Sequence, residues 1–137
     1  MSDIVIYTDG GARGNPGKAG AGVVIREDGR TIATLKKYLG NNRTNNWAEY
    51  EALILALTEA KKRGMAKSRL EIRMDSELIV RQIQGEYQVK EETLWPQYMK
   101  AHNLLVANFP DAKFVHIPRS ENAEADRLVN EAIDEVR

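Results

Sequence analysis

The order of apolar and polar positions along the chain predicts five strands and four helices. Runs rich in β-branched residues, or with alternating apolar residues, predict strands over residues 4–9, 19–26, 31–38, 70–74 and 113–117. Apolar residues three or four positions apart predict helices over residues 45–63, 76–84, 93–107 and 120–136. After its first three strands the chain therefore alternates between the two kinds of element, which is typical of α/β proteins.

The order of these elements predicts the sheet. The Asp28-Gly29 pair is a strong hairpin signal, so we expect the first three strands to form an antiparallel meander. Helices precede each of the last two strands, and right-handed crossovers would make both strands run parallel to the first. The predicted fold class is α/β, with a five-stranded mixed sheet (an antiparallel three-strand meander plus two parallel strands) flanked by helices. We expect a single domain over residues 1–137, because no repeat or linker interrupts the pattern.

Local signals predict where elements end. Thr44 or Asn45 can cap the longest helix, Gly64 can end it, and Ser120 can cap the last helix. Residues 10–18 are rich in glycine and are predicted to be a tight loop that lets another backbone, a metal or a ligand approach Asp9. Their spacing fits neither the P-loop nor the dinucleotide-binding pattern. Residues 40–44 are predicted to be a polar turn.

Composition limits the classes of function. The 137 residues contain 20 basic and 20 acidic side chains, so the overall charge predicts no polyanionic partner. Nucleic-acid binding would need a local basic surface or bound metal ions. The chain has no cysteine, which excludes disulfides, thiolate zinc sites and a cysteine nucleophile. It shows neither a signal-peptide pattern nor an apolar run of membrane-spanning length, so we expect a cytoplasmic protein without membrane contact.

Four carboxylates are the candidates for chemistry. Asp9 and Asp75 each follow a predicted strand, Glu49 lies on the apolar stripe of the longest helix, and Asp126 borders the stripe of the last helix. Two of them have a structural alternative: Asp9 precedes a glycine, and Asp-Gly is a common turn pair, while Glu49 could simply favour a helix N-terminus. The predicted topology brings all four to one edge of the sheet, where they would repel one another without cations. Oxygen ligands alone favour Mg²⁺ or Mn²⁺, and two such ions roughly 4 Å apart promote in-line phosphoryl displacement.

Five motifs, in this order along the chain, carry a resemblance to a known family. They are Tyr7-Thr8-Asp9-Gly10-Gly11, Gly14-Asn15-Pro16-Gly17, Thr44-Asn45-Asn46-Trp47-Ala48-Glu49, Met74-Asp75-Ser76 and Asn122-Ala123-Glu124-Ala125-Asp126. Over nearly its whole length the chain resembles type 1 ribonuclease H. The resemblance implies a ribonuclease H-like fold and a metal-dependent endoribonuclease that hydrolyses the RNA strand of RNA–DNA hybrids with two Mg²⁺ or Mn²⁺ ions.

The resemblance also implies roles for individual residues. The metal-binding carboxylates of the family fall on Asp9, Glu49, Asp75 and Asp126. Contacts to ribose 2′-hydroxyls and nearby bases fall on Asn15, Asn45 and Asn46, with backbone contacts from Gly10 and Gly11. Many members carry a histidine ten residues before the fourth carboxylate, which is His116 here. That histidine assists the leaving group or product release in the family, although His116 could instead be structural, and Arg119 could supply the charge.

The chain also departs from the family pattern. The segment of residues 85–93 is short and contains one basic residue, Lys90, and three acidic ones, Glu86, Glu91 and Glu92. Many members have a long basic segment at this place. Many members have a glutamine where Glu77 stands, and the N-terminal hybrid-binding domain of some members has no counterpart here. These features resemble the compact branch of the family, and we expect a monomer. Two other interpretations stay open, namely a DNA nuclease or strand transferase, and a hybrid-binding module without activity.

Overall fold

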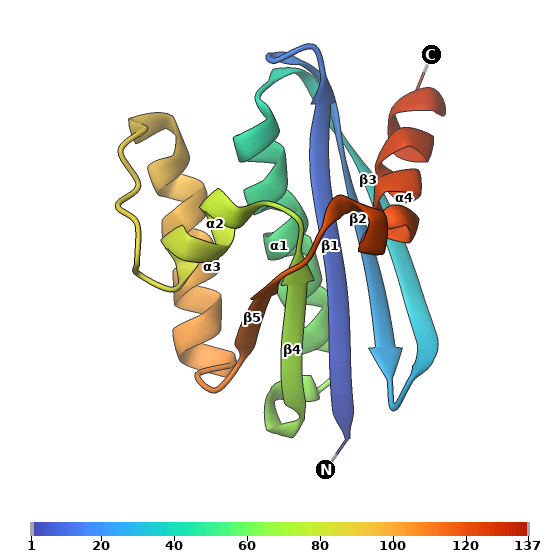
Figure 1. Ribbon diagram of the computed structural model, residues 1–137, viewed down its shortest axis with the longest axis vertical. Coiled ribbons are helices and arrows are strands. Elements are labelled where there is room, and N and C mark those ends of the chain that lie inside the picture. The colour runs from blue at the N-terminus through green and yellow to red at the C-terminus, as the bar shows by residue number, and fades with distance from the viewer. Residues whose placement is uncertain (1, 137) are drawn as a thin grey trace.

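The computed structural model describes residues 2–136, which form a five-stranded sheet with helices on both faces (Figure 1). The strands are β1 (Asp3–Arg13), β2 (Gly17–Glu27), β3 (Arg30–Arg43), β4 (Arg69–Met74) and β5 (Lys113–His116). Their order across the sheet is β3-β2-β1-β4-β5. β1 pairs antiparallel with β2 and parallel with β4, β2 pairs antiparallel with β3, and β4 pairs parallel with β5. The predicted topology is confirmed.

Four α-helices and three short 3₁₀ helices lie between or after these strands within the described residues. The α-helices are α1 (Asn45–Lys62), α2 (Glu77–Ile83), α3 (Trp95–Asn108) and α4 (Ala123–Asp134), and the 3₁₀ helices are η1 (Met65–Lys67), η2 (Glu92–Leu94) and η3 (Arg119–Glu121). Thr44 caps α1, because its hydroxyl accepts a hydrogen bond from the backbone N–H of Trp47 at 3.2 Å. Gly64 follows the helix with a left-handed φ of 73°, as expected for a helix end.

The glycine-rich segment is not the loop that the sequence predicts. β1 and β2 extend through it, with Arg13 paired to Lys18, and only residues 14–16 form the turn. The glycines serve close packing here: a Cβ at Gly22 would lie 2.3 Å from the carbonyl oxygen of Ala125 in α4. Residues 40–43, predicted to be a turn, likewise continue β3, because Arg43 pairs with Gly17 of the extended β2.

The predicted cap of the last helix is also wrong. Ser120 lies inside η3, and α4 begins three residues later at Ala123, with Asn122 at the capping position. Backbone hydrogen bonds from Glu121 to Pro118 and from Asn122 to Arg119 close this 3₁₀ turn first. Because of this turn, α4 begins at Ala123, and Asn122 lies next to β1.

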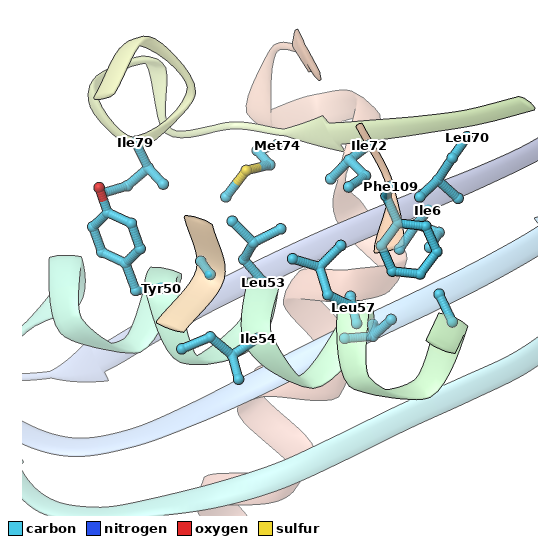
Figure 2. Packing of buried hydrophobic residues seen from close by; sticks show 14 of the residues in the cluster. Ile6, Tyr50, Leu53, Ile54, Leu57, Leu70, Ile72, Met74, Ile79 and Phe109 are labelled. Carbon is cyan, nitrogen blue, oxygen red and sulfur yellow. The ribbon is translucent and has the colours of Figure 1, made fainter. Parts of the chain in front are cut away.

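Two apolar layers fix the helices on the sheet. On one face, α1 packs on β1 and β2, and α3 packs on α1. Figure 2 shows this core, to which α1 contributes Tyr50, Leu53, Ile54 and Leu57, and the rest of the chain contributes Ile6, Leu70, Ile72, Met74, Ile79 and Phe109. On the other face, Ala125 and Leu128 of α4 pack on Val24 and Tyr7. The starts of α1 and α4 therefore flank the same region of β1 from opposite faces.

Candidate active site

Three carboxylates from different elements converge beside the ends of the parallel strands. Asp9 lies in β1, Glu49 near the start of α1, and Asp75 directly after β4. Because Thr8 pairs with Met74, Asp9 and Asp75 are the next residues on adjacent parallel strands. One carboxylate oxygen from each of the three lies within 4.8 Å of the others. The structure thus brings together three of the four candidate acidic residues.

Gly10 sets the position of Glu49. Its backbone N–H donates a hydrogen bond of 3.0 Å to Oε1 of Glu49. A Cβ at this position would lie 2.1 Å from the carbonyl oxygen of Ala48, so any side chain would push α1 away from β1. The lack of a side chain at Gly10 therefore lets the helix deliver Glu49 to the strand that carries Asp9.

Asp126 flanks the cluster from α4. It lies in the first turn of that helix and is partly buried, and it is not part of the group of three within 4.8 Å. Its negative charge nevertheless contributes to raising the pKa of Asp9 and the pKa of Asp75. The fourth candidate therefore lies close enough to interact electrostatically with two of the others.

Burial and mutual repulsion dominate the electrostatics of the site. Burial, followed by the charge of Asp75, raises the pKa of Asp9 to about 7. Burial, followed by the charge of Asp9, raises the pKa of Glu49 well above its ordinary value. Burial also raises the pKa of Asp75, while the amide of Asn122 and the charge of Arg119 act in the opposite direction. The negative charges have little compensation from the protein itself.

The oxygens of the cluster fit a divalent cation. Oε2 of Glu49 and Oδ2 of Asp75 are buried and have no hydrogen-bond partner. A buried acceptor without a partner costs about 1–3 kcal/mol, more when it is charged, unless something binds it. Hard cations such as Mg²⁺ and Mn²⁺ prefer oxygen ligands of this kind. The donor set thus fits the class of metal expected from the sequence.

The asparagines lie at the edge of this site with their oxygens engaged. Oδ1 of Asn45 accepts a hydrogen bond from the backbone of Ala12 at 2.8 Å, and Oδ1 of Asn15 accepts one from the backbone of Asn45 at 3.0 Å. Within residues 2–136, neither side-chain NH₂ group donates a hydrogen bond, and both residues are exposed. Asn46 is partly buried. The β1–β2 hairpin and the start of α1 therefore present two oriented amide donors to solvent.

His116 and Arg119 lie on the segment between β5 and α4. His116 ends β5, where it pairs with Met74, and its side chain is exposed. Arg119 is also exposed, and its charge lowers the pKa of Asp75 against the effect of burial. The structure thus provides an electrostatic link between Arg119 and the carboxylate cluster.

Sequence reasoning did not single out Asn122 as a site residue. Its side chain is 1% exposed, and Nδ2 donates a hydrogen bond of 2.9 Å to the carbonyl oxygen of Thr8, the residue before Asp9. The signal in the sequence was its position one helical turn before Asp126, on the same side of the last helix.

The carboxylates lie away from a large cavity at the other end of the sheet. A cavity of about 780 Å³ lies at the opposite ends of the parallel strands, between the start of β1, η1 and the α3–β5 connection. None of the four candidate acidic residues lines it. This cavity is therefore separate from the carboxylate cluster. Among the described residues, no helix has both the length and the apolar character that crossing a membrane requires.

Comparison with known proteins identifies the family. A family model described as reverse transcriptase-like matches residues 7–132. A bifunctional protein of Mycobacterium tuberculosis is 40% identical over 132 residues, which are 96% of this chain and 35% of that protein. Ribonuclease HI of Halobacterium salinarum is 40% identical over 130 residues, 94% of this chain and 63% of that protein. This chain therefore spans between about one third and two thirds of the length of these two relatives.

The solved structures agree with this assignment. LC11-RNase H1, isolated from compost by a metagenomic approach, has a TM-score of 0.93 and 54% identity, and the match covers 98% of both chains. The same protein in complex with an RNA/DNA hybrid matches with a TM-score of 0.92. Because both the family model and LC11-RNase H1 cover most of this chain, it belongs to the type 1 ribonuclease H proteins of the reverse transcriptase-like family, in their compact form.

Proposed function

We propose that this chain is a metal-dependent endoribonuclease that hydrolyses the RNA strand of RNA–DNA hybrids by a two-metal-ion mechanism. The observation that carries the proposal is the cluster of Asp9, Glu49 and Asp75, in which Oε2 of Glu49 and Oδ2 of Asp75 are buried without hydrogen-bond partners. The complex of the similar LC11-RNase H1 with an RNA/DNA hybrid supports the substrate class.

Four carboxylates would hold the metal ions. Asp9, Glu49 and Asp75 supply oxygens within 4.8 Å of one another, and Asp126 adds a carboxylate from α4. Mg²⁺ or Mn²⁺ bound there would lower the pKa of a water nucleophile and stabilise charge on the attacking and leaving oxygens. The protein favours binding of these ions because packed strands and helices hold the acidic groups close together. Since one chain provides all four carboxylates, we propose that it acts as a monomer.

The asparagines would recognise the RNA strand. Asn15 and Asn45 keep their oxygens in internal hydrogen bonds, so their NH₂ groups are available as donors to a 2′-hydroxyl oxygen. Asn46 follows on the same turn of α1 and would extend this contact. Glu49 accepts the N–H of Gly10, so the carbonyl of Gly10 and the backbone of Gly11 would supply the backbone contacts to the same strand. A site built to hydrogen-bond a hydroxyl discriminates strongly against a strand that lacks it.

His116 and Arg119 would act on the leaving group. The charge of Arg119 lies near enough to affect Asp75, which supports a role in stabilising negative charge on the departing oxygen. His116 could transfer a proton from the exposed end of β5. The two roles differ in their dependence on pH.

One assay tests the proposal. A labelled RNA–DNA hybrid, duplex DNA and duplex RNA are each incubated with the protein in Mg²⁺, in Mn²⁺, or in chelator, beside the Asp75→Asn variant. We expect internal cuts in the RNA of the hybrid with metal, and none with chelator or with the variant. Cleavage of duplex DNA in place of the hybrid, or full activity of Asp75→Asn, would overturn the proposal.

A further inference from the structure

We propose that Asn122 is a positioning residue that holds the carboxylates of β1, the β4–α2 connection and α4 in the one arrangement that binds a divalent cation. This inference rests on the proposed function, since it concerns the same metal site. Asn122 comes after η3, far along the chain from Asp9 and Asp75, yet its buried side chain contacts β1 at the residue before Asp9.

Two hydrogen bonds connect Asn122 to the segments that carry Asp9 and Asp126. Its Nδ2 donates to the carbonyl oxygen of Thr8 at 2.9 Å, which fixes the strand one residue before Asp9. Its own carbonyl oxygen accepts the backbone N–H of Asp126 at 3.0 Å, which starts the first turn of α4. The amide of Asn122 also lowers the pKa of Asp75 against the effect of burial, so the two side chains are neighbours. Asn122 thus helps to fix the positions of Asp9, Asp75 and Asp126 relative to one another.

A purely structural role accounts poorly for this side chain. Asparagine at a helix start usually accepts a hydrogen bond from the helix backbone, but the side chain of Asn122 makes no capping bond. Its Oδ1 is buried without a partner, although a buried unsatisfied acceptor costs about 1–3 kcal/mol. An arrangement that lowers stability in this way is expected where the geometry of a functional site is being held. Residues that orient metal ligands typically change metal affinity by about 10–100-fold when removed.

The test measures Mn²⁺ binding without substrate, so that it does not depend on activity. The full chain is titrated with Mn²⁺ alone by calorimetry, and its unfolding midpoint is followed with and without Mn²⁺. The variants are Asn122→Ala and Asn122→Ser. The control is Asn108→Ala, because Asn108 also donates its Nδ2 to a backbone carbonyl, that of Leu104 at 3.1 Å, but lies at the end of α3.

We expect both Asn122 variants to bind Mn²⁺ at least about tenfold more weakly than the wild type, with a smaller upward shift of the midpoint. Their kcat should fall, while binding of hybrid in chelator stays unchanged. Asn108→Ala should lose some stability and keep its Mn²⁺ affinity.

A folded Asn122→Ala or Asn122→Ser protein with wild-type Mn²⁺ affinity would overturn the inference and leave the proposed function intact. Failure of both variants to fold in chelator would also overturn it, because the residue would then be structural. Failure of the proposed function looks different: the wild type itself would neither bind Mn²⁺ nor cut hybrid.

Discussion

At the scale of single residues, the main feature is acidic groups buried without positive partners. Asp9 is 5% exposed and Glu49 is 6% exposed, and burial is the first cause of the raised pKa of each. The unfolded chain does not bear this cost, because there the carboxylates are solvated. The metal-free protein should therefore be less stable when these groups ionise.

The first prediction is a fall in the stability of the metal-free protein as pH rises from about 4 to about 7. The pKa of Asp9 is about 7 in the folded state and lies near 4 in an unfolded chain, so only the folded state holds the proton in this window. The contribution of Asp9 to the free energy of unfolding is then complete below pH 4. As the pH rises toward 7, this contribution decreases by up to about 1.4 kcal/mol for each pH unit. Urea unfolding in chelator at several pH values measures it.

The Asp9→Asn variant is the control for this measurement. It cannot ionise at position 9, so its free energy of unfolding should fall less over the same pH window, and it should exceed the wild type near pH 7. Subtracting the two curves removes the contribution of surface carboxylates. Parallel curves for the wild type and Asp9→Asn would contradict the prediction.

The second prediction separates the roles of Arg119 and His116. Arginine stays protonated throughout the accessible range, whereas histidine changes charge near neutral pH. If Arg119 stabilises the leaving oxygen, Arg119→Ala lowers the rate by a similar factor at every pH. If His116 is the general acid, His116→Ala lowers kcat by about 10²-fold or more and changes the alkaline limb of the pH–rate profile.

The structure favours a contribution from Arg119, because its charge reaches Asp75. We therefore expect Arg119→Ala to be slow at all pH values measured with hybrid and Mg²⁺. Folded Arg119→Ala with a normal rate and profile would assign the role to His116 alone or to neither residue.

The candidate carboxylates could be found from the sequence because each breaks a local pattern. Asp9 interrupts an apolar strand, and Glu49 stands on an apolar helix stripe. The contact of Asn122 with Thr8 joins residues 114 positions apart and depends on the 3₁₀ turn that delays α4. No periodicity encodes such a contact.

At the scale of elements, glycines decide how closely the helices approach the sheet. Gly10 lets α1 reach β1, and Gly22 lets α4 reach β2. The sequence suggested a loop for the glycine-rich segment because glycine is common in loops. In the structure this segment is part of two strands, because β1 pairs with β2 through it and α1 packs on both strands. These contacts join distant parts of the chain, so local sequence does not reveal them. The hairpin at Asp28-Gly29 was predictable because its signal is local.

The third prediction concerns the distance between β2 and α4. In Gly22→Ala, the new Cβ would meet the carbonyl oxygen of Ala125 at 2.3 Å and Cβ of Leu128 at 2.8 Å, so the helix must shift. Overpacking of this kind costs about 1–3 kcal/mol. The shift would also move Asp126, so we expect a lower rate on hybrid as well as a lower unfolding midpoint.

Gly29→Ala is the matched control. Gly29 has a φ of 85° and open space around it, so alanine there suffers only the backbone penalty of about 1–2 kcal/mol. The hairpin at residues 28–29 is remote from the carboxylates, and activity below the unfolding transition should stay normal. Equal losses of activity in the two variants would show that stability alone explains the effect.

At the scale of the whole molecule, the balance of charge limits how the protein holds a polyanion. The chain has 20 basic and 20 acidic side chains. Several basic groups already pair with carboxylates, as Arg13 does with Asp134 and Lys36 with Glu131. We therefore expect metal ions bound by the carboxylates to supply a large share of the attraction to phosphates.

The fourth prediction is a shallow dependence of hybrid binding on salt. Each phosphate contact adds about 0.9 to the slope of log affinity against log salt on B-form duplex. We expect the slope of about two to four contacts, measured by fluorescence anisotropy of a labelled hybrid with Ca²⁺ present to limit cleavage. A slope several times steeper would reveal a basic surface that binds independently of the metal.

The pairing of Thr8 with Met74 also determines where the chain can change in length. Adding or deleting one residue within β4 would exchange the faces of its side chains, turning Arg73 inward and Asp75 away from Asp9. Residues 86–91 pair with no strand, so the connection from α2 to η2 can lengthen without moving either carboxylate. A basic segment inserted in this connection should therefore raise the affinity for nucleic acid without disturbing the carboxylates. β1 and β4, in contrast, must keep their present lengths.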